Sequence, residues 1–169
     1  FFISNDTLYL FVINSTEGKS PMTKKSIKND RNRRFAALTL LNLSHTAYAE
    51  SPDEANLETF DNLYAGRDYV VTFDCPEFTS LCPVTGQPDF GAVTLRYVPD
   101  KKCVESKSLK LYLFSFRNHN SFHEEVVNAV LDIVVAACKP RRAEVVGIFR
   151  PRGGIAIHVK AVYGDKIDA

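Results

Sequence analysis

The sequence predicts an α+β fold in which two strands are followed by two helices and then by two further strands. Three observations carry this prediction. Apolar and polar residues alternate in short segments, which is the period of a half-buried strand, and apolar residues fall at helical spacing in the middle of the chain. A glycine-rich turn joins the last two strand-like segments. Four strands with two helices on one face leave the sheet edges open, and such units commonly pair their edges with neighbouring subunits in a ring.

The first two strands lie on either side of a segment rich in proline. Residues 69–73 alternate in hydrophobicity and predict the first strand. Residues 92–98 alternate again, with the β-branched and aromatic side chains that are typical of strands. Between them, residues 75–88 contain three prolines and Gly86, so we expect a stiff loop there.

Two helices and a hairpin follow. Residues 109–116 are apolar, and their leucines and lack of glycine favour a helix. Ser121 opens a second, amphipathic helix, which Lys139-Pro140 ends. Its apolar residues at helical spacing are Val126, Val127, Val130, Ile133, Val134 and Ala137. Strands at 145–149 and 155–159 then pair through the turn Arg150-Pro151-Arg152-Gly153-Gly154.

Length and composition predict one folded domain, residues 44–169, behind a flexible extension, residues 1–43. The 169 residues are 45% hydrophobic and 24% charged, which is ordinary for a globular protein. The formal net charge of +1 lacks the basic excess of nucleic-acid-binding proteins, so we expect a small-molecule partner and no direct contact with nucleic acid. No apolar run reaches the roughly 20 residues of a membrane-spanning helix, so we expect no membrane partner.

The predicted extension contains two features of its own. Met22 is the only methionine, and we expect translation to start there, with an additional strand in residues 1–21 as the alternative. Residues 24–34 form a basic, polar run without apolar periodicity. We expect a solvated arm, and the alternative is an RNA-binding patch.

The cysteines indicate a cytoplasmic protein with reduced thiols, at least one of them reactive. The chain has four: Cys75, Cys82, Cys103 and Cys138. Their spacing matches no zinc site, and a domain of this size does not need a disulfide framework. His119 and His123 could in principle share a metal ion, but no third ligand lies at a useful spacing. We therefore expect no metal site.

The most informative stretch carries a cysteine and, seven residues later, an aspartate. A nucleophilic cysteine needs its thiolate, and a carboxyl group can return a proton to a developing anion. Cys82 and Asp89 therefore form a candidate catalytic pair on a proline-rich segment. On spacing alone, the more common alternative is that Cys82 is a small buried side chain and Asp89 a turn residue.

Three further groups of polar residues have both a functional and a structural interpretation. Lys107 and Lys110 lie on one face of a helix, where they either clamp a phosphate-bearing cofactor or remain solvated. Glu124 either closes a capping box with Ser121 or binds the edge of a guanine-like base. Arg152, like Arg150, either holds phosphates or is an exposed hairpin residue.

Six motifs in order resemble the family of NADPH-dependent 7-cyano-7-deazaguanine reductases, which act in queuosine biosynthesis. They are Cys-Pro-Glu-Phe-Thr-Ser-Leu-Cys-Pro, Thr-Gly-Gln-Pro-Asp-Phe, Glu-Ser-Lys-Ser-Leu-Lys-Leu-Tyr, Phe-Arg-Asn-His, Phe-His-Glu and Pro-Arg-Gly-Gly-Ile, between residues 57 and 163. The resemblance is to the short, single-module form. It implies the tunnelling fold, a ββααββ antiparallel sheet with two helices on one face, and a homo-oligomeric ring, as pentamers stacked into a decamer.

The resemblance also implies a role for each matching residue. Cys82 corresponds to the nucleophile that forms a thioimide with the nitrile, and Asp89 to the acid that protonates its nitrogen. Residues that correspond to substrate-binding positions are Glu124, His123, Glu105 and Ser106. Residues that correspond to NADPH-binding positions are Lys107, Lys110 and Arg152. The product is the aminomethyl compound, 7-aminomethyl-7-deazaguanine.

Two other functions compete with this one. A GTP cyclohydrolase-like enzyme of the same fold would open a purine-type ring with zinc, but its metal-binding cysteines and histidine are not at usable spacings here. A non-catalytic module for a guanine-like ligand or tRNA would not need the pair formed by Cys82 and Asp89. We expect the nitrile reductase.

Overall fold

The main sheet has four antiparallel strands in the order β2-β3-β5-β6. The structure is a computed structural model that describes residues 35–36, 38–40 and 48–167. The strands are β2 (Val71–Leu81), β3 (Pro88–Val98), β5 (Arg142–Phe149) and β6 (His158–Tyr163). The predicted extension lies mostly outside the described residues, as do Met22 and the whole basic run 24–34. No helix in the described part of the chain is long and apolar enough to cross a membrane.

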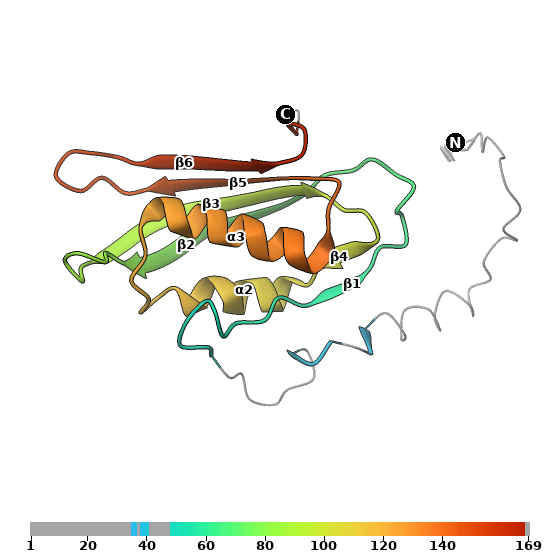
Figure 1. Ribbon diagram of the computed structural model, residues 1–169, viewed down its shortest axis with the longest axis horizontal. Coiled ribbons are helices and arrows are strands. Elements are labelled where there is room, and N and C mark those ends of the chain that lie inside the picture. The colour runs from blue at the N-terminus through green and yellow to red at the C-terminus, as the bar shows by residue number, and fades with distance from the viewer. Residues whose placement is uncertain (1–34, 37, 41–47, 168–169) are drawn as a thin grey trace, which may run out of the picture.

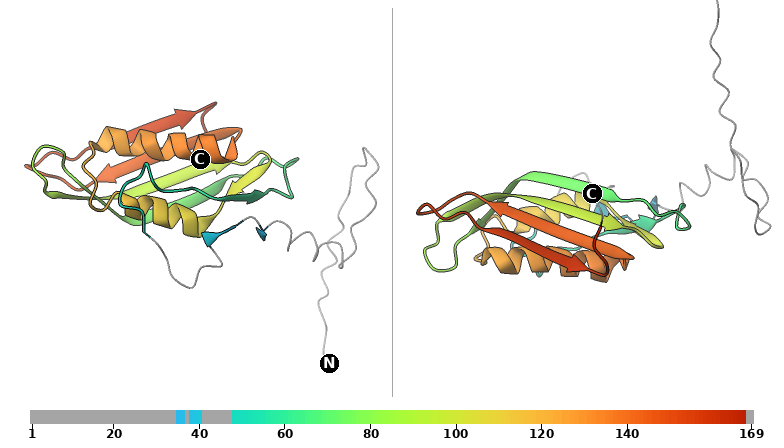
Figure 2. Two further views of the ribbon diagram at one scale, coloured as in Figure 1. Left: turned by 60° about the horizontal axis from the view of Figure 1, so that its bottom comes forward. Right: turned by 90° about the horizontal axis from the view of Figure 1, so that it is seen from above.

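Two helices, α2 (Ser106–Ser115) and α3 (His123–Cys138), cover one face of this sheet, as Figure 1 shows. The right-hand view in Figure 2 looks onto the opposite face of the sheet, with the helices behind it. The predicted α+β class and the order ββααββ of the main elements are therefore confirmed. Within the described residues, the edge strands β2 and β6 each pair with one neighbour only.

A small second sheet was not predicted from the sequence. It pairs β1 (Thr59–Asp61) with β4 (Lys102–Val104), in antiparallel register from Thr59 opposite Val104 to Asp61 opposite Lys102. Strands of three residues are too short to show an alternating pattern, which explains why the sequence did not reveal them. This sheet lies next to the start of α2 and fixes the segment that leads into it.

The prediction of a loop at residues 75–88 is wrong for most of this segment. β2 continues to Leu81, and β3 already begins at Pro88, so the connection contains only residues 82–87. The register shifts between Cys75 and Phe78, which is a β-bulge around Pro76. Because β2 is an edge strand, a proline without an N–H group is tolerated there.

The hairpin between β5 and β6 is longer than predicted. β6 begins at His158 rather than at Ile155, and the connection spans residues 150–157. The predicted turn itself is present: Arg152 and Ile155 form an antiparallel bridge, and Gly153 and Gly154 adopt φ values of +57° and +82°. These left-handed conformations favour glycine.

A glutamate side chain caps the start of each helix, but at α3 it is not the glutamate that the sequence predicted. The Glu105 side chain caps α2 by accepting hydrogen bonds from two backbone N–H groups. At α3 the backbone N–H of Phe122 donates to Glu125 Oε2 at 2.9 Å, so the cap lies one residue later than the predicted pair of Ser121 and Glu124. Glu124 is therefore not used by the cap.

The core lies between the helices and the sheet, and its largest fully buried side chains include Tyr97, Phe116 and Phe149. The closest approach is between α3 and β5 at Gly147. A Cβ atom there would lie 2.6 Å from Val127 Cγ2 and 2.8 Å from a ring carbon of Phe149. The absence of a side chain at Gly147 thus sets how deeply α3 packs, and so where its first residues lie.

Candidate active site

A short turn after β2 presents Cys82. The Cys82 N–H donates to the Gln87 carbonyl at 2.9 Å, and the Gly86 N–H donates to the Cys82 carbonyl at 2.9 Å. Gly86 has a φ of +67°, which a residue with a side chain rarely adopts. The turn therefore folds back on itself and leaves the cysteine side chain partly exposed.

The same turn is joined to the loop before α3. The Leu81 N–H donates to the His119 carbonyl at 3.1 Å, and the Leu81 carbonyl accepts from the Ser121 N–H at 3.0 Å. These two bonds make a short parallel bridge around Asn120. Cys82 is consequently held next to the start of α3.

The environment of Cys82 favours its thiolate. Hydrogen bonds from the Thr85 hydroxyl and from the backbone N–H groups of Thr85 and Val84, with a further one from Arg152, lower the pKa of Cys82 to about 7. Burial instead raises the pKa of Cys75, and raises that of Cys138 to about 12. A reactive cysteine is one whose thiolate is accessible at neutral pH. Cys82 meets this condition.

Asp89 lies at the start of β3 and is 4% exposed. Its Oδ1 atom lies 2.6 Å from Arg152 Nη1, and its Oδ2 atom lies 3.5 Å from His123 Nε2. Arg152 also donates to the Thr85 hydroxyl at 3.2 Å and to the Gln87 side chain. The carboxylate and the cysteine turn are thus connected through one guanidinium group.

His123 is the first residue of α3, and its ring stacks on Phe149 with centroids 3.9 Å apart and planes 11° apart. Its Nε2 atom is buried and has no hydrogen-bond partner among the described residues. A buried polar atom without a partner is uncommon in a folded protein, because the lost hydrogen bond to water is not replaced. This atom is suited to bind a group of a ligand.

These residues surround a cavity of about 380 Å³, which we call the Cys82 cavity. Its polar lining includes Cys82, Thr85, Asp89, His123, Glu124 and Arg152. Phe122, Ile155 and Ile157 supply apolar surface. Small-molecule sites commonly combine an apolar lining with a few convergent polar groups, and a cavity of this volume accommodates a bicyclic base.

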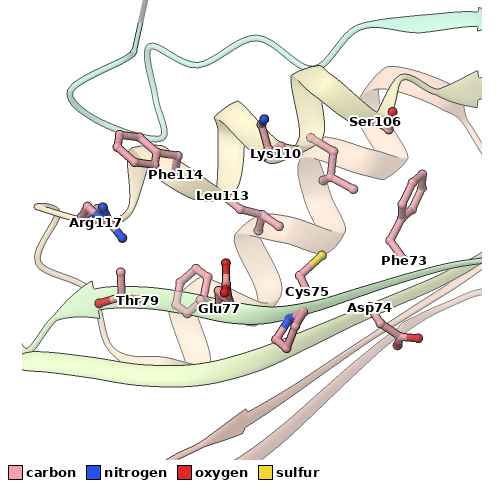
Figure 3. A pocket seen from close by; sticks show the side chains of 13 residues that line it. Phe73, Asp74, Cys75, Glu77, Thr79, Ser106, Lys110, Leu113, Phe114 and Arg117 are labelled. Carbon is pink, nitrogen blue, oxygen red and sulfur yellow. The ribbon is translucent and has the colours of Figure 1, made fainter.

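A second cavity of about 380 Å³ lies between β2 and α2. Figure 3 shows Cys75 and Glu77 pointing from β2 toward α2, which carries Lys110 and Phe114. Ser106 and Arg117 complete its polar lining on the helix side. We call this the α2 cavity, and no described residue lines both it and the Cys82 cavity.

The structure brings five of the nine candidate residues into one site and places the other four around α2. The five are Cys82, Asp89, His123, Glu124 and Arg152. Of the other four, Glu105 caps α2, with its carboxylate 2.8 Å from Lys107 N and 2.7 Å from Ser108 N. Lys107 Nζ donates to the Leu40 carbonyl, while Ser106 and Lys110 line the α2 cavity.

Thr85, Gln87 and Phe149 also belong to the site, and none of them was singled out from the sequence. Thr85 and Gln87 lie within the motif Thr-Gly-Gln-Pro-Asp-Phe, which was the available signal. Their contacts with Arg152 arise only when the hairpin after β5 folds over the turn. Phe149 resembles an ordinary core residue, and its stacking on His123 depends on the tertiary structure.

The fold and the activated cysteine define a class, that of the QueF-like proteins. The model of this family, described as "QueF-like protein", matches residues 88–168. The crystal structure of the archaeosine synthase QueF-Like in the apo form superimposes with a TM-score of 0.54 and 24% identity, covering 58% of this chain and 96% of that one. This likeness concerns the fold, and it confirms the predicted tunnelling fold.

Curated relatives place the chain within the class. The NADPH-dependent 7-cyano-7-deazaguanine reductase of Neisseria gonorrhoeae is 53% identical over 133 residues, which are 79% of this chain and 85% of the relative. The reductase of Streptococcus mutans is 56% identical over 127 residues, 75% of this chain and 78% of the relative. That of Bacteroides thetaiotaomicron is 56% identical over 119 residues, 70% and 79% respectively. The chain belongs to the family of the NADPH-dependent 7-cyano-7-deazaguanine reductases.

Proposed function

We propose that the protein reduces the nitrile of 7-cyano-7-deazaguanine to an aminomethyl group with NADPH, through a thioimide on Cys82. The observation that carries this proposal is a cysteine of pKa about 7 that lines the same cavity as a buried aspartate. A nitrile accepts hydride poorly, and covalent capture by a thiolate turns it into a more reactive C=N group. Relatives named for this reaction share more than half of their aligned residues with the chain.

In the first step, the Cys82 sulfur bonds to the nitrile carbon while one π bond of the nitrile opens toward nitrogen. With a pKa of about 7, about half of the Cys82 thiols are already thiolate at neutral pH. Asp89 takes up the proton that Cys82 releases and passes it to the nitrogen, so Asp89 ends the step as the carboxylate that it was at the start. Atoms and charges therefore balance without another reactant, and the product of the step is a neutral thioimide.

The start of α3 is suited to hold the base. Glu124 lines the cavity and is free of the helix cap, so its carboxylate can accept two hydrogen bonds from the amino-pyrimidine edge. The Nε2 atom of His123, which has no hydrogen-bond partner among the described residues, offers a further contact. Phe122, which is 51% exposed, and Ile157 provide apolar surface for the faces of the ring. Glu105 and Ser106 remain candidates for substrate contacts at α2.

The positive charges at α2 fit a phosphate-bearing cofactor. Lys110 and Arg117 line the α2 cavity, and Lys107 lies one turn earlier on the same helix. Ammonium and guanidinium groups are the usual partners of phosphates. NADPH, when bound, supplies hydride, and two NADPH per nitrile are needed because the conversion to an amine takes four electrons.

We further propose that neighbouring subunits complete the site in a ring, as pentamers stacked into a decamer. The lysines of α2 and the Cys82 cavity lie in different parts of one chain. β2 and β6 are edge strands in the described chain, so each can pair with a strand of a neighbour. Light scattering tests this proposal, and a stable, active monomer contradicts it.

The decisive experiment mixes the protein, 7-cyano-7-deazaguanine and NADPH and follows the absorbance of the reduced nicotinamide. We expect about two NADPH oxidised per aminomethyl product. A ratio near one with an imine or aldehyde accumulating contradicts the proposal, as does equal use of NADH by the intact protein. Metal analysis of the same sample separates this function from a zinc-dependent ring-opening reaction.

A further inference from the structure

Arg152 is held in a fixed position by the hairpin that carries it. Its N–H donates to the Ile155 carbonyl at 3.0 Å, and the Ile155 N–H donates back to the Arg152 carbonyl at 3.0 Å. Gly153 and Gly154 form the turn between them with left-handed φ values. The side chain is 34% exposed and leaves this bridge toward the cysteine turn.

The described partners of the guanidinium all belong to the Cys82 site. Nη1 lies 2.6 Å from Asp89 Oδ1, and Nη2 donates to Thr85 Oγ1 at 3.2 Å and to Gln87 Oε1. Arg152 also contributes, after the groups of Thr85 and Val84, to the lowered pKa of the Cys82 thiol. Arginine presents five N–H donors in a rigid plane, so it can hold several acceptors in one arrangement where a lysine cannot.

We propose that Arg152 is a positioning residue that aligns the Cys82 thiolate with Asp89, acting in part through Thr85, rather than a ligand for the phosphates of the cofactor. The reaction that it serves rests on the function proposed above. The effect of Arg152 on Cys82 does not depend on that function, because the contacts of Arg152 are present in the protein without any ligand.

The charges around Cys82 show why such a residue is needed. The charged or titratable groups that line the cavity are Asp89 on β3, His123 and Glu124 on α3, and Arg150 and Arg152 after β5. Two of these groups, Asp89 and Glu124, are carboxylates that share the cavity with Cys82, and like charges in one site repel each other. Arg150 lies over the ring of Phe90, with its guanidinium carbon 5.8 Å from the centroid. Arg152 is the lining cation that lies 2.6 Å from Asp89 and that contributes to the lowered pKa of Cys82.

Thr85 is the intermediary in this arrangement. Its hydroxyl accepts from Arg152 and in turn hydrogen-bonds to the Cys82 sulfur, the largest single cause of the lowered thiol pKa. Because a hydroxyl that accepts a charged hydrogen bond becomes a better donor, Arg152 strengthens the bond that stabilises the thiolate. The same guanidinium binds Asp89, which lines the same cavity as Cys82.

The test measures Cys82 in two ways that need no cofactor. The first is the rate of alkylation of Cys82 by iodoacetamide against pH, read by mass spectrometry of its peptide. The second is the rate of adduct formation with 7-cyano-7-deazaguanine without NADPH. In Arg152→Ala we expect the alkylation midpoint to rise from about 7 by roughly one unit and the adduct to form roughly tenfold more slowly at pH 7. Arg152→Lys keeps the charge without the planar fork, and we expect it to recover less than half of the loss.

Two further variants complete the comparison. Thr85→Val removes the intermediary hydroxyl from an exposed position, so folding is not at risk, and it should raise the midpoint as well. Thr85→Ser keeps the hydroxyl and should therefore keep the wild-type alkylation midpoint. Lys110→Ala is the cofactor-side control: we expect a raised KM for NADPH with unchanged alkylation and unchanged adduct formation.

The proposal is overturned if Arg152→Ala keeps the wild-type alkylation midpoint and adduct rate and only raises the KM for NADPH. That result assigns Arg152 to the cofactor. If the midpoint shifts in Arg152→Ala but the wild-type protein forms no adduct with the nitrile, the positioning role stands and the nitrile reductase function fails. The two proposals can therefore be distinguished in one set of experiments.

Discussion

The Asp89 carboxylate and the Arg152 guanidinium lie 2.6 Å apart although the two residues are separated by 63 positions in the chain. Asp89 is buried at the start of β3, and Arg152 is in the hairpin between β5 and β6. Their contact joins the hairpin to the cysteine turn, and Cys82, Asp89 and Arg152 line one cavity. The predictions below test the parts of this arrangement separately.

Cys82→Ala should abolish both the thioimide and turnover, because no other described thiol lines the cavity. Protein mixed with 7-cyano-7-deazaguanine without NADPH is examined by mass spectrometry for an increase of one intact substrate, since addition to a nitrile expels no leaving group. Cys75→Ala is the matched control: its pKa is raised by burial and it lies in the α2 cavity, so the adduct should form largely as before. An adduct that follows Cys75 and survives the loss of Cys82 shows that the nucleophile is misassigned.

Asp89→Asn should slow adduct formation by about 10²-fold or more, because the side chain keeps its shape but no longer carries a proton to the nitrogen. Substrate binding through Glu124 should persist, so stopped-flow rates and equilibrium titration are measured on the same variant. Loss of binding with an unchanged rate at saturation would assign Asp89 to recognition instead of proton transfer.

Adduct formation should increase with pH through about 7, in step with the thiolate of Cys82. A thiol whose pKa is lowered reacts above that value and loses reactivity below it, so at pH 6 about one tenth of the plateau rate should remain. An unperturbed cysteine would instead reach its midpoint near pH 8.5. A wild-type midpoint at or above 8.5 would mean that the turn does not activate the sulfur.

Neutralising the lysines of α2 should affect the cofactor and spare the nitrile. Lys107→Ala and Lys110→Ala should each raise the KM for NADPH more than that for 7-cyano-7-deazaguanine, since the removed ammonium groups are the proposed phosphate contacts. Steady-state kinetics with each substrate varied in turn provide the measurement. A larger effect on the nitrile would place these residues at the substrate.

Gly147→Ala should lower the free energy of unfolding by about 1–3 kcal/mol, because the added methyl group has no room. Its Cβ would lie 2.6 Å from Val127 and 2.8 Å from Phe149, whose ring supports His123. Gly66→Ala is the control, with no atom within 4 Å of the added carbon. Denaturant unfolding compares the two variants, and equal stabilities would contradict the tight contact.

The sequence predicted those parts of the fold in which one pattern dominates. The apolar spacing from Val126 to Ala137 predicted α3, and the alternation at 92–98 predicted most of β3. The prediction failed where two signals compete. Pro76 indicates a loop, but an edge strand tolerates a proline at a β-bulge. Residue type and spacing also could not assign the contacts of Thr85, because they depend on a hairpin that closes from a distant part of the chain.

For the candidate site, the motifs drew attention to Cys82 and Asp89, and the structure places these two residues in the same cavity. They could not indicate that Glu124 is free of the helix cap, since Glu125 is an equally good capping residue by type. Nor could the motifs reveal the ion pair between Arg152 and Asp89, because ion pairs between distant segments leave no local sequence pattern.

The two hydrogen bonds of Leu81 to His119 and Ser121 have a consequence for redesigning the enzyme. They join the cysteine turn to the start of α3, so the proposed base-binding surface and the proposed nucleophile are held together by backbone hydrogen bonds. If α3 were shifted so that the cavity could accommodate other nitriles, the Cys82 sulfur would be displaced as well. Substrate range should therefore be broadened by changing side chains such as Phe122 and Ile157, which line the cavity without taking part in this connection.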